Sequence, residues 1–122
     1  MTDQNQGRIL WHDLTVPEAE TVRDFYRAVV GWRPDGVDMG GYEDFNMNTP
    51  DGQTQAGVCH ARGVNTGIPP VWMVYIKVEN LDHALERCVA LNGRIVNGPI
   101  GDAGSRICII EDPAGAVCAL AE

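Results

Sequence analysis

The same strand-then-helix pattern occurs twice in this chain, at positions 62 residues apart. A segment rich in β-forming residues ends at Val16, and a similar segment ends at Val78. An amphipathic helical pattern stops at Gly31 and again at Gly93, and glycine is a common residue just beyond a helix. Because strand and helix share one offset, the sequence predicts an internal duplication of a β-α-β-β-β unit.

In the first half, residues 8–16 favour a strand, and Pro17 opens a helix that runs to Val30. Residues 32–41 are rich in turn formers, and short strands are predicted at about 42–48 and 53–60. The apolar stripe of the helix, which we expect to face the core, consists of Ala19, Val22, Phe25, Tyr26, Val29 and Val30.

The second half repeats this order after a linker at 61–70. A strand is predicted at 71–78, and Asn80 caps a helix that stops before Gly93. Three strands follow, near 94–97, 105–111 and 116–120. The glycine-rich run Asn97–Ser105 is expected to be a mobile loop at the border of a cleft.

These elements predict a single α+β domain over residues 1–122. It contains two βαβββ modules, at about 8–60 and 71–120. We expect the modules to form paired curved sheets, each with a helix on its back, around a cleft. Binding sites favour such concave junctions, so the cleft is the expected ligand site.

Charge and composition narrow the possible partners. Nine basic residues face seventeen acidic ones, which gives a net charge of -8 and excludes a basic surface for nucleic acid or anionic membranes. No apolar stretch approaches a membrane span, and the polar start lacks the apolar region of a signal peptide. We therefore expect a cytoplasmic protein whose four cysteines, none in a C-x-x-C pair, are small buried core thiols.

Several motifs together resemble one superfamily, the vicinal oxygen chelate proteins, which include glyoxalases, bleomycin-resistance proteins and extradiol dioxygenases. The resemblance is to its small glyoxalase-like subgroup and spans nearly the whole chain. It implies the paired-module fold without fixing the reaction. The matching pieces are Trp11–Leu14, Phe25-Tyr26, Gly31-Trp32, Trp72–Tyr75, Gly93 and Asp112–Ala116.

Enzymes of this superfamily hold a divalent metal with His and Glu side chains that point into the cleft. Carried over residue by residue, the resemblance places those positions at Trp11, Met73, Ala119 and Ala56, with Val58 as the alternative to Ala56. Indole and methyl groups cannot ligate a metal, and a thioether suits soft Cu(I). The resemblance therefore implies an erased metal site, and we expect neither a metal nor another cofactor.

The histidines leave alternatives open. Strand alternation places His12 on the helix side with Leu14, although a one-residue slip would turn it into the cleft. His60 shares the parity expected for the cleft and is either a polar residue at its rim or a solvated strand end. A metal site can be imagined from His12, Cys59, His60 and Glu111, but their spacing does not support it.

Asp13 and Tyr75 are also 62 positions apart and face the expected cleft. They either orient a ligand or act as base and acid; alternatively, Asp13 pairs with a backbone N–H or with Arg106. Trp11 and Met73 either line the ligand site or belong to the core.

We therefore expect a metal-free protein that binds an apolar or aromatic small molecule. The alternatives are a lyase, isomerase or dioxygenase with a displaced metal site or acid–base chemistry, and an interaction module with a closed cleft. Neither nucleic acid nor membrane is an expected partner. A homodimer is expected, with Ile9, Trp32 and Ile68 available for its interface.

Overall fold

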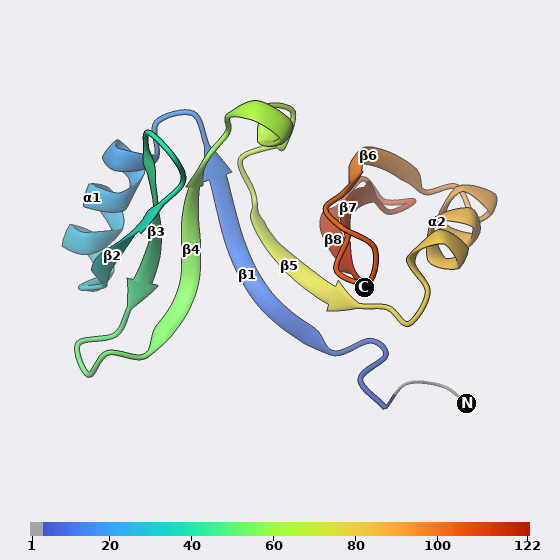
Figure 1. Cartoon of the computed structure of the whole chain (residues 1–122), viewed down its shortest axis with the longest axis horizontal. Coiled ribbons are helices and arrows are strands. Elements are labelled where there is room, and N and C mark those ends of the chain that lie inside the picture. Colours follow the sequence, from blue (N-terminus) through green and yellow to red (C-terminus); the bar gives the residue numbers. More distant parts are fainter. Residues whose placement is uncertain (1–3) are drawn as a thin grey trace. The chain divides into compact units, whose positions relative to one another are not determined.

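The computed structural model describes residues 4–122 and divides into two compact units (Figure 1). The first unit is His12–Trp72, and the second is Met73–Glu122 together with the described residues before His12. In each unit, one face of the sheet packs against a helix. Within residues 4–122, no helix has the length and hydropathy that a membrane span requires.

The first unit orders its strands β2-β3-β4-β1, with β1 parallel to β4. Gly31 ends the helix in the left-handed conformation that its position predicts, with φ 77°. The elements are β1 (Ile9–Val16), α1 (Ala19–Val30), β2 (Arg33–Asp38), β3 (Glu43–Asn48), β4 (Thr54–His60) and a short 3-10 helix (Gly63–Asn65).

Strand β2 corrects the prediction of a turn-rich segment at 32–41. It pairs with β3 along its whole length, from Arg33 opposite Asn48 to Asp38 opposite Glu43. The strand lies at the sheet edge, where a residue without an N–H donor such as Pro34 is tolerated. Pairing with β3 therefore overrides the local preference for turns.

The second unit orders its strands β5-β8-β7-β6, with β5 parallel to β8. The Asn80 side chain accepts a hydrogen bond from the His83 N–H, which confirms the predicted cap. Strand β6 is longer than predicted, so the first part of the run 97–105 is strand rather than loop. The elements are β5 (Trp72–Lys77), α2 (Leu81–Ala90), β6 (Arg94–Ile100), β7 (Ile107–Glu111) and β8 (Val117–Ala121).

The two units repeat one topology, which confirms the predicted α+β class with two βαβββ modules. Counted from each first strand, the strand order is the same. Asp13 lies opposite Gly57 in one parallel pair, and Tyr75 lies opposite Ala119 in the other. Both members of these pairs are 62 positions apart, as the duplication predicts. The cleft between the modules stays a prediction.

Each helix closes an apolar core on one face of its own sheet. In the first unit that core consists of Leu14, Val16, Ala19, Phe45, Met47 and Val58. In the second unit it consists of Val78, Leu81, Leu85, Cys108, Ile110 and Leu120. Fully burying one such aliphatic side chain contributes about 1.5–3 kcal/mol, so these clusters are a main source of each unit's stability.

The helix α1 buries less of its apolar stripe than its periodicity predicts. Ala19 is buried, whereas Phe25, Val29 and Val30 are each more than half exposed. These three residues form the outer edge of the stripe. Its outer edge therefore remains uncovered within the chain.

The residues expected at an interface between copies lie in different environments. Ile9 is exposed, but Ile68 is buried, which makes it a core residue rather than a surface one. Trp32 packs against the first core and contacts the rings of Tyr26 and Trp72. The Trp72 indole also donates a hydrogen bond of 3.0 Å to the Tyr26 hydroxyl.

All four cysteines are free thiols in the described part of the chain. Cys108 is fully buried, as predicted, whereas Cys59, Cys88 and Cys118 are half-buried.

Candidate functional site

The helix-free face of the second unit is apolar. Met73 and Tyr75 alternate along β5 with residues whose side chains pack toward α2, so they point to the opposite face. Ala119 lies beside Tyr75, and Ile109 lies beside Ala119. Met73, Ala119 and Ile109 are at most 2% exposed. Three of the predicted site residues thus share one apolar surface.

The helix-free face of the first unit is polar. Asp13 lies opposite Gly57 on this face, and Asn46 is the next neighbour across the sheet. A Cβ at position 57 would overlap the Asp13 carboxylate. Glycine, which has no Cβ, therefore allows the carboxylate to occupy this position. Trp11 precedes this unit on the same strand, has the same strand parity as Asp13 and is half-buried.

Cys59 lies near Asp13 and stays a neutral thiol. Burial raises the pKa of its thiol, and the negative charges of Asp13 and Asp44 raise that pKa further. A thiolate is the form that attacks substrates and binds metals. Burial and the two carboxylates therefore disfavour the thiolate form of Cys59.

Ala56 and Val58 do not lie on the face that strand parity led us to expect. Val58 packs in the helix-side core, and Ala56 has the same parity on β4. The cause is a β-bulge: Met47 pairs with Ala56 but Asn48 pairs with Thr54, so one residue of β4 is extra. An extra residue reverses the faces of every position beyond it.

Gly57, not Ala56 or Val58, is therefore the counterpart of Ala119. The four equivalent positions become Trp11, Gly57, Met73 and Ala119. Sequence reasoning missed Gly57 because the bulge depends on pairing with β3. The unequal spacing of the later turn glycines, 63 positions instead of 62, was the available signal.

His60 is neither a cleft rim nor a solvated strand end. It is 5% exposed on the helix side, where its Nε2 lies 2.9 Å from Glu20 Oε2 and its Nδ1 lies 3.2 Å from Asp44 Oδ1. Because a carboxylate only accepts, both contacts are hydrogen bonds when the ring carries both N–H groups. The hydrogen bond from His60 lowers the pKa of the Glu20 carboxyl.

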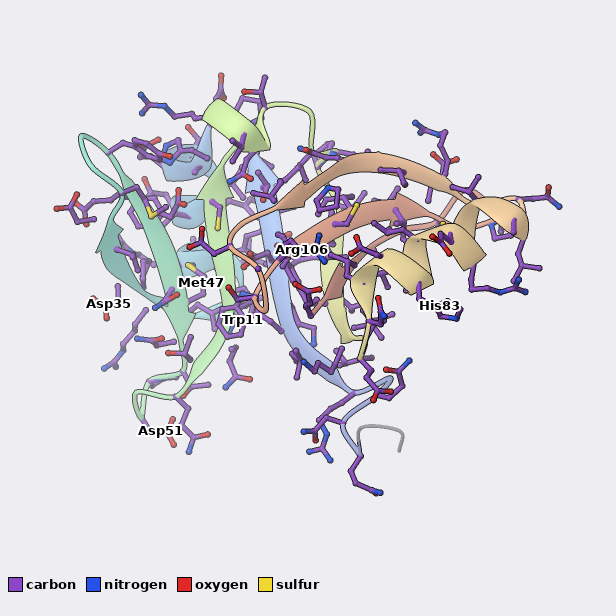
Figure 2. All side chains as sticks on the ribbon, turned by 45° about the vertical axis from the view of Figure 1, so that its right-hand side comes forward. Trp11, Asp35, Met47, Asp51, His83 and Arg106 are labelled. Carbon is purple, nitrogen blue, oxygen red and sulfur yellow. The ribbon has the colours of Figure 1, made fainter. Side chains whose placement is uncertain are left out.

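The other polar residues that the sequence singled out lie apart from this group. His12 is exposed, and His83 projects outward from α2 (Figure 2). Arg106, considered as a partner of Asp13, pairs with Asp82 and Glu122.

Glu111 pairs with Arg94, and His60 is held by Glu20 and Asp44. Across residues 4–122, no three His, Cys, Asp or Glu side chains are grouped to hold a metal ion.

A family model, "Glyoxalase/Bleomycin resistance protein/Dioxygenase superfamily", matches residues 8–120 and confirms the resemblance. The chain is 32% identical to "Putative glyoxylase CFP32" of Mycobacterium bovis over 98% of this chain and 47% of that protein. It is 27% identical to "Anthracycline biosynthesis protein DnrV" of Streptomyces peucetius over 98% of this chain and 48% of that protein. The chain thus spans about half the length of these curated relatives.

Among solved structures, the chain is similar to methylmalonyl-CoA epimerase from Mycobacterium tuberculosis. The TM-score is 0.53 and the sequence identity 19%, over 100% of this chain and 92% of that one. At this identity the likeness shows the fold alone.

Proposed function

Because the chain belongs to the glyoxalase/bleomycin resistance protein/dioxygenase superfamily, we propose that it binds an apolar or aromatic small molecule without a divalent metal. We place the contacts of this ligand on the helix-free face of the second unit, at Met73, Tyr75 and Ala119. The proposal includes a cytoplasmic location, which four free cysteines support. It also includes a homodimer, and neither nucleic acid nor membrane as a partner.

The observation that carries the proposal is the set of side chains at the four metal positions of the superfamily. They are an indole, a hydrogen, a thioether and a methyl group, at Trp11, Gly57, Met73 and Ala119. A catalytic divalent site needs about three protein ligands with N, O or S donors. These four positions supply only a soft sulfur.

The chemistry of each helix-free face, taken by itself, is compatible with an aromatic ligand. Met73, Ala119 and Ile109 give the second unit an apolar surface, and the Tyr75 phenol stands beside it. In the first unit, Gly57 leaves room for the Asp13 carboxylate, which accepts hydrogen bonds. A hydroxyl or amine on an aromatic ring suits this carboxylate.

The test combines elemental analysis of protein purified without an affinity tag with thermal unfolding against a panel of phenols, anilines and unsubstituted arenes. We expect less than one equivalent of metal and a raised unfolding temperature with ring compounds that carry a donor. A ligand at about 100 times its Kd stabilises the native state by about 2.7 kcal/mol.

Two variants make the test specific. Met73→Ala should reduce the thermal shift, while Val89→Ala, a truncation at an exposed position on α2, should leave it unchanged. One equivalent of bound metal, with glyoxalase activity on added Ni²⁺ or Zn²⁺, would replace the binding function with the enzymatic alternative.

A further inference from the structure

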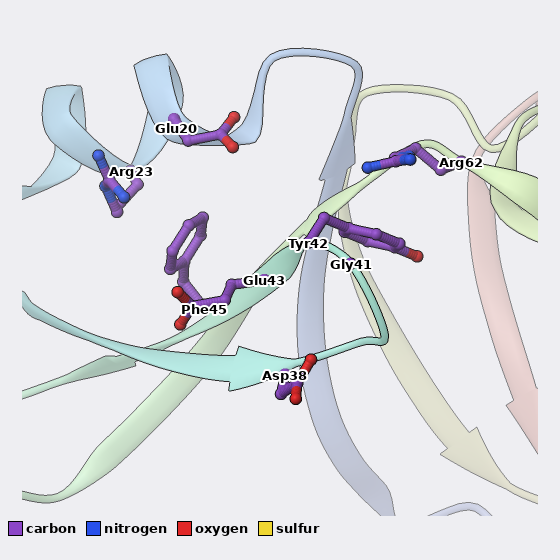
Figure 3. A pocket seen from close by; sticks show the side chains of 8 residues that line it. All are labelled: Glu20, Arg23, Asp38, Gly41, Tyr42, Glu43, Phe45 and Arg62. Atoms are coloured by element: carbon purple, nitrogen blue, oxygen red, sulfur yellow. The ribbon is translucent and has the colours of Figure 1, made fainter.

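The first unit contains a pocket that the helix-free faces do not include. It has a volume of about 740 Å³, within the range of small-molecule sites. Figure 3 shows it between the start of α1, the turn after β2 and the segment after β4. Its lining includes Glu20, Arg23, Asp38, Tyr42, Phe45 and Arg62.

Two opposite charges face each other in this pocket without meeting. Figure 3 shows the Glu20 carboxylate and the Arg62 guanidinium pointing toward one another. Among the described residues, no ion pair within 4.0 Å involves Arg62. The guanidinium carbon instead lies 3.9 Å from the centroid of the Tyr42 ring, and this cation–π contact holds the group at the pocket wall.

The Glu20 carboxylate is held in place by the buried side chain of His60. His60 Nε2 lies 2.9 Å from Glu20 Oε2, the ring Nδ1 lies 3.2 Å from Asp44 Oδ1, and Asp44 accepts a hydrogen bond from the backbone N–H of His60. His60 and Asp44 are at most 8% exposed, so the support is buried while Glu20 itself is exposed. The lowered pKa of Glu20 keeps the carboxylate ionised.

We propose that this pocket binds a small zwitterion of the amino-acid type, with its ammonium group on Glu20 and its carboxylate on Arg62. The other charges of the pocket support this choice over a simple ion. A plain anion would meet Glu20, Asp38 and Glu43, and a plain cation would meet Arg62. Arg23 adds little free positive charge, because it pairs with Asp24 at 2.9 Å.

Three matched probes test the proposal: L-phenylalanine, 2-phenylethylamine and 3-phenylpropionate. The amine lacks the carboxylate of phenylalanine, and the acid lacks its ammonium group. Binding to the whole chain is followed by calorimetry and by amide chemical shifts. Because each lost contact is a charge-assisted hydrogen bond, we expect phenylalanine to bind at least about tenfold more tightly than either analogue.

Charge-neutral variants locate the site. Glu20→Gln keeps a hydrogen-bond acceptor for His60, and Arg62→Gln keeps a polar side chain. Each should weaken phenylalanine binding about tenfold and reduce the preference over the matching analogue. Glu86→Gln and Arg87→Gln, at exposed positions on α2 in the other unit, are the matched controls and should change nothing.

Three results would overturn the proposal. The first is equal binding of phenylalanine and either analogue. The second is phenylalanine binding that persists in both pocket variants, which would place the amino acid elsewhere. The third is no binding of phenylalanine to a folded wild-type chain at millimolar concentration. Unfolding temperatures of all variants show whether a lost signal reflects lost binding or lost structure.

Discussion

At the scale of single residues, the close fit between Gly57 and Asp13 makes position 57 sensitive to any side chain. We expect Gly57→Ala to displace the Asp13 carboxylate and to lower the free energy of unfolding by about 1–2 kcal/mol, as overpacking does. Urea unfolding measures this change. In an Asp13→Ala background the same substitution should cost less, because the overlapping group is gone.

Gly67→Ala is the control for this substitution. A Cβ at position 67 would meet no atom within 4 Å, so the free energy of unfolding should change little. Equal costs at both positions would show that the contact with Asp13 does not explain the effect.

The buried Asp44 carboxylate depends on its contact with His60. His60→Ala removes the ring that stands between Asp44 and Glu20, and Asp44 loses its contact with the ring Nδ1 while it keeps the bond from the backbone N–H at position 60. We expect the free energy of unfolding to fall by about 2 kcal/mol, because a buried carboxylate loses a charge-assisted hydrogen bond. His83→Ala removes an exposed ring and should cost much less; similar losses in urea unfolding would contradict this account.

At the scale of elements, one arginine joins the start of α2 to the end of the last strand. Arg106 contacts Asp82 in the first turn of the helix and Glu122 just after β8. The hydrogen bonds from Arg106 lower the pKa of the Glu122 carboxyl to about 2, from a usual 4.5. The ionised form is therefore favoured in the folded state.

This lowered pKa predicts an acid dependence of stability. The contribution of Glu122 is complete above about pH 4.5 and is lost as the pH falls toward about 2, because the unfolded state then binds the proton first. Glu122→Gln should make the free energy of unfolding less dependent on pH in this window. Urea unfolding at pH 6, 4 and 3 measures it, and an unchanged slope in the variant would refute the assignment.

At the scale of the whole molecule, the uncovered edge of α1 predicts self-association. Phe25, Val29 and Val30 form an exposed apolar strip on a chain that carries a net charge of -8. We expect light scattering at micromolar concentration to give about twice the 13.3 kDa chain mass, the commonest state of soluble oligomers.

A lysine on this strip should break the dimer. Val29→Lys is expected to return the mass to that of one chain, while Val64→Lys, at a position that is also exposed, should not. A wild-type protein that scatters as a single chain would exclude the dimer altogether.

The sequence by itself determined most elements and their repetition. Helix periodicity, the Gly31 stop and the Asn80 cap act within a few residues, so they are readable without knowledge of the fold. The 62-residue offset and the family motifs then indicated the two-module class. The apolar character of Met73 and Ala119 was also readable, because the strand that holds each follows its alternation without interruption.

Only the tertiary structure decided which side of its sheet each residue of β4 faces. The extra residue opposite Met47 and Asn48 reverses that strand, which moves Val58 into the helix-side core and puts Gly57 beside Asp13. Strand β2 likewise exists because β3 pairs with it. The partners of His60 come from positions 16 and 40 residues away. Pairing and packing between distant segments set these features, so the local preferences of the residues do not predict them.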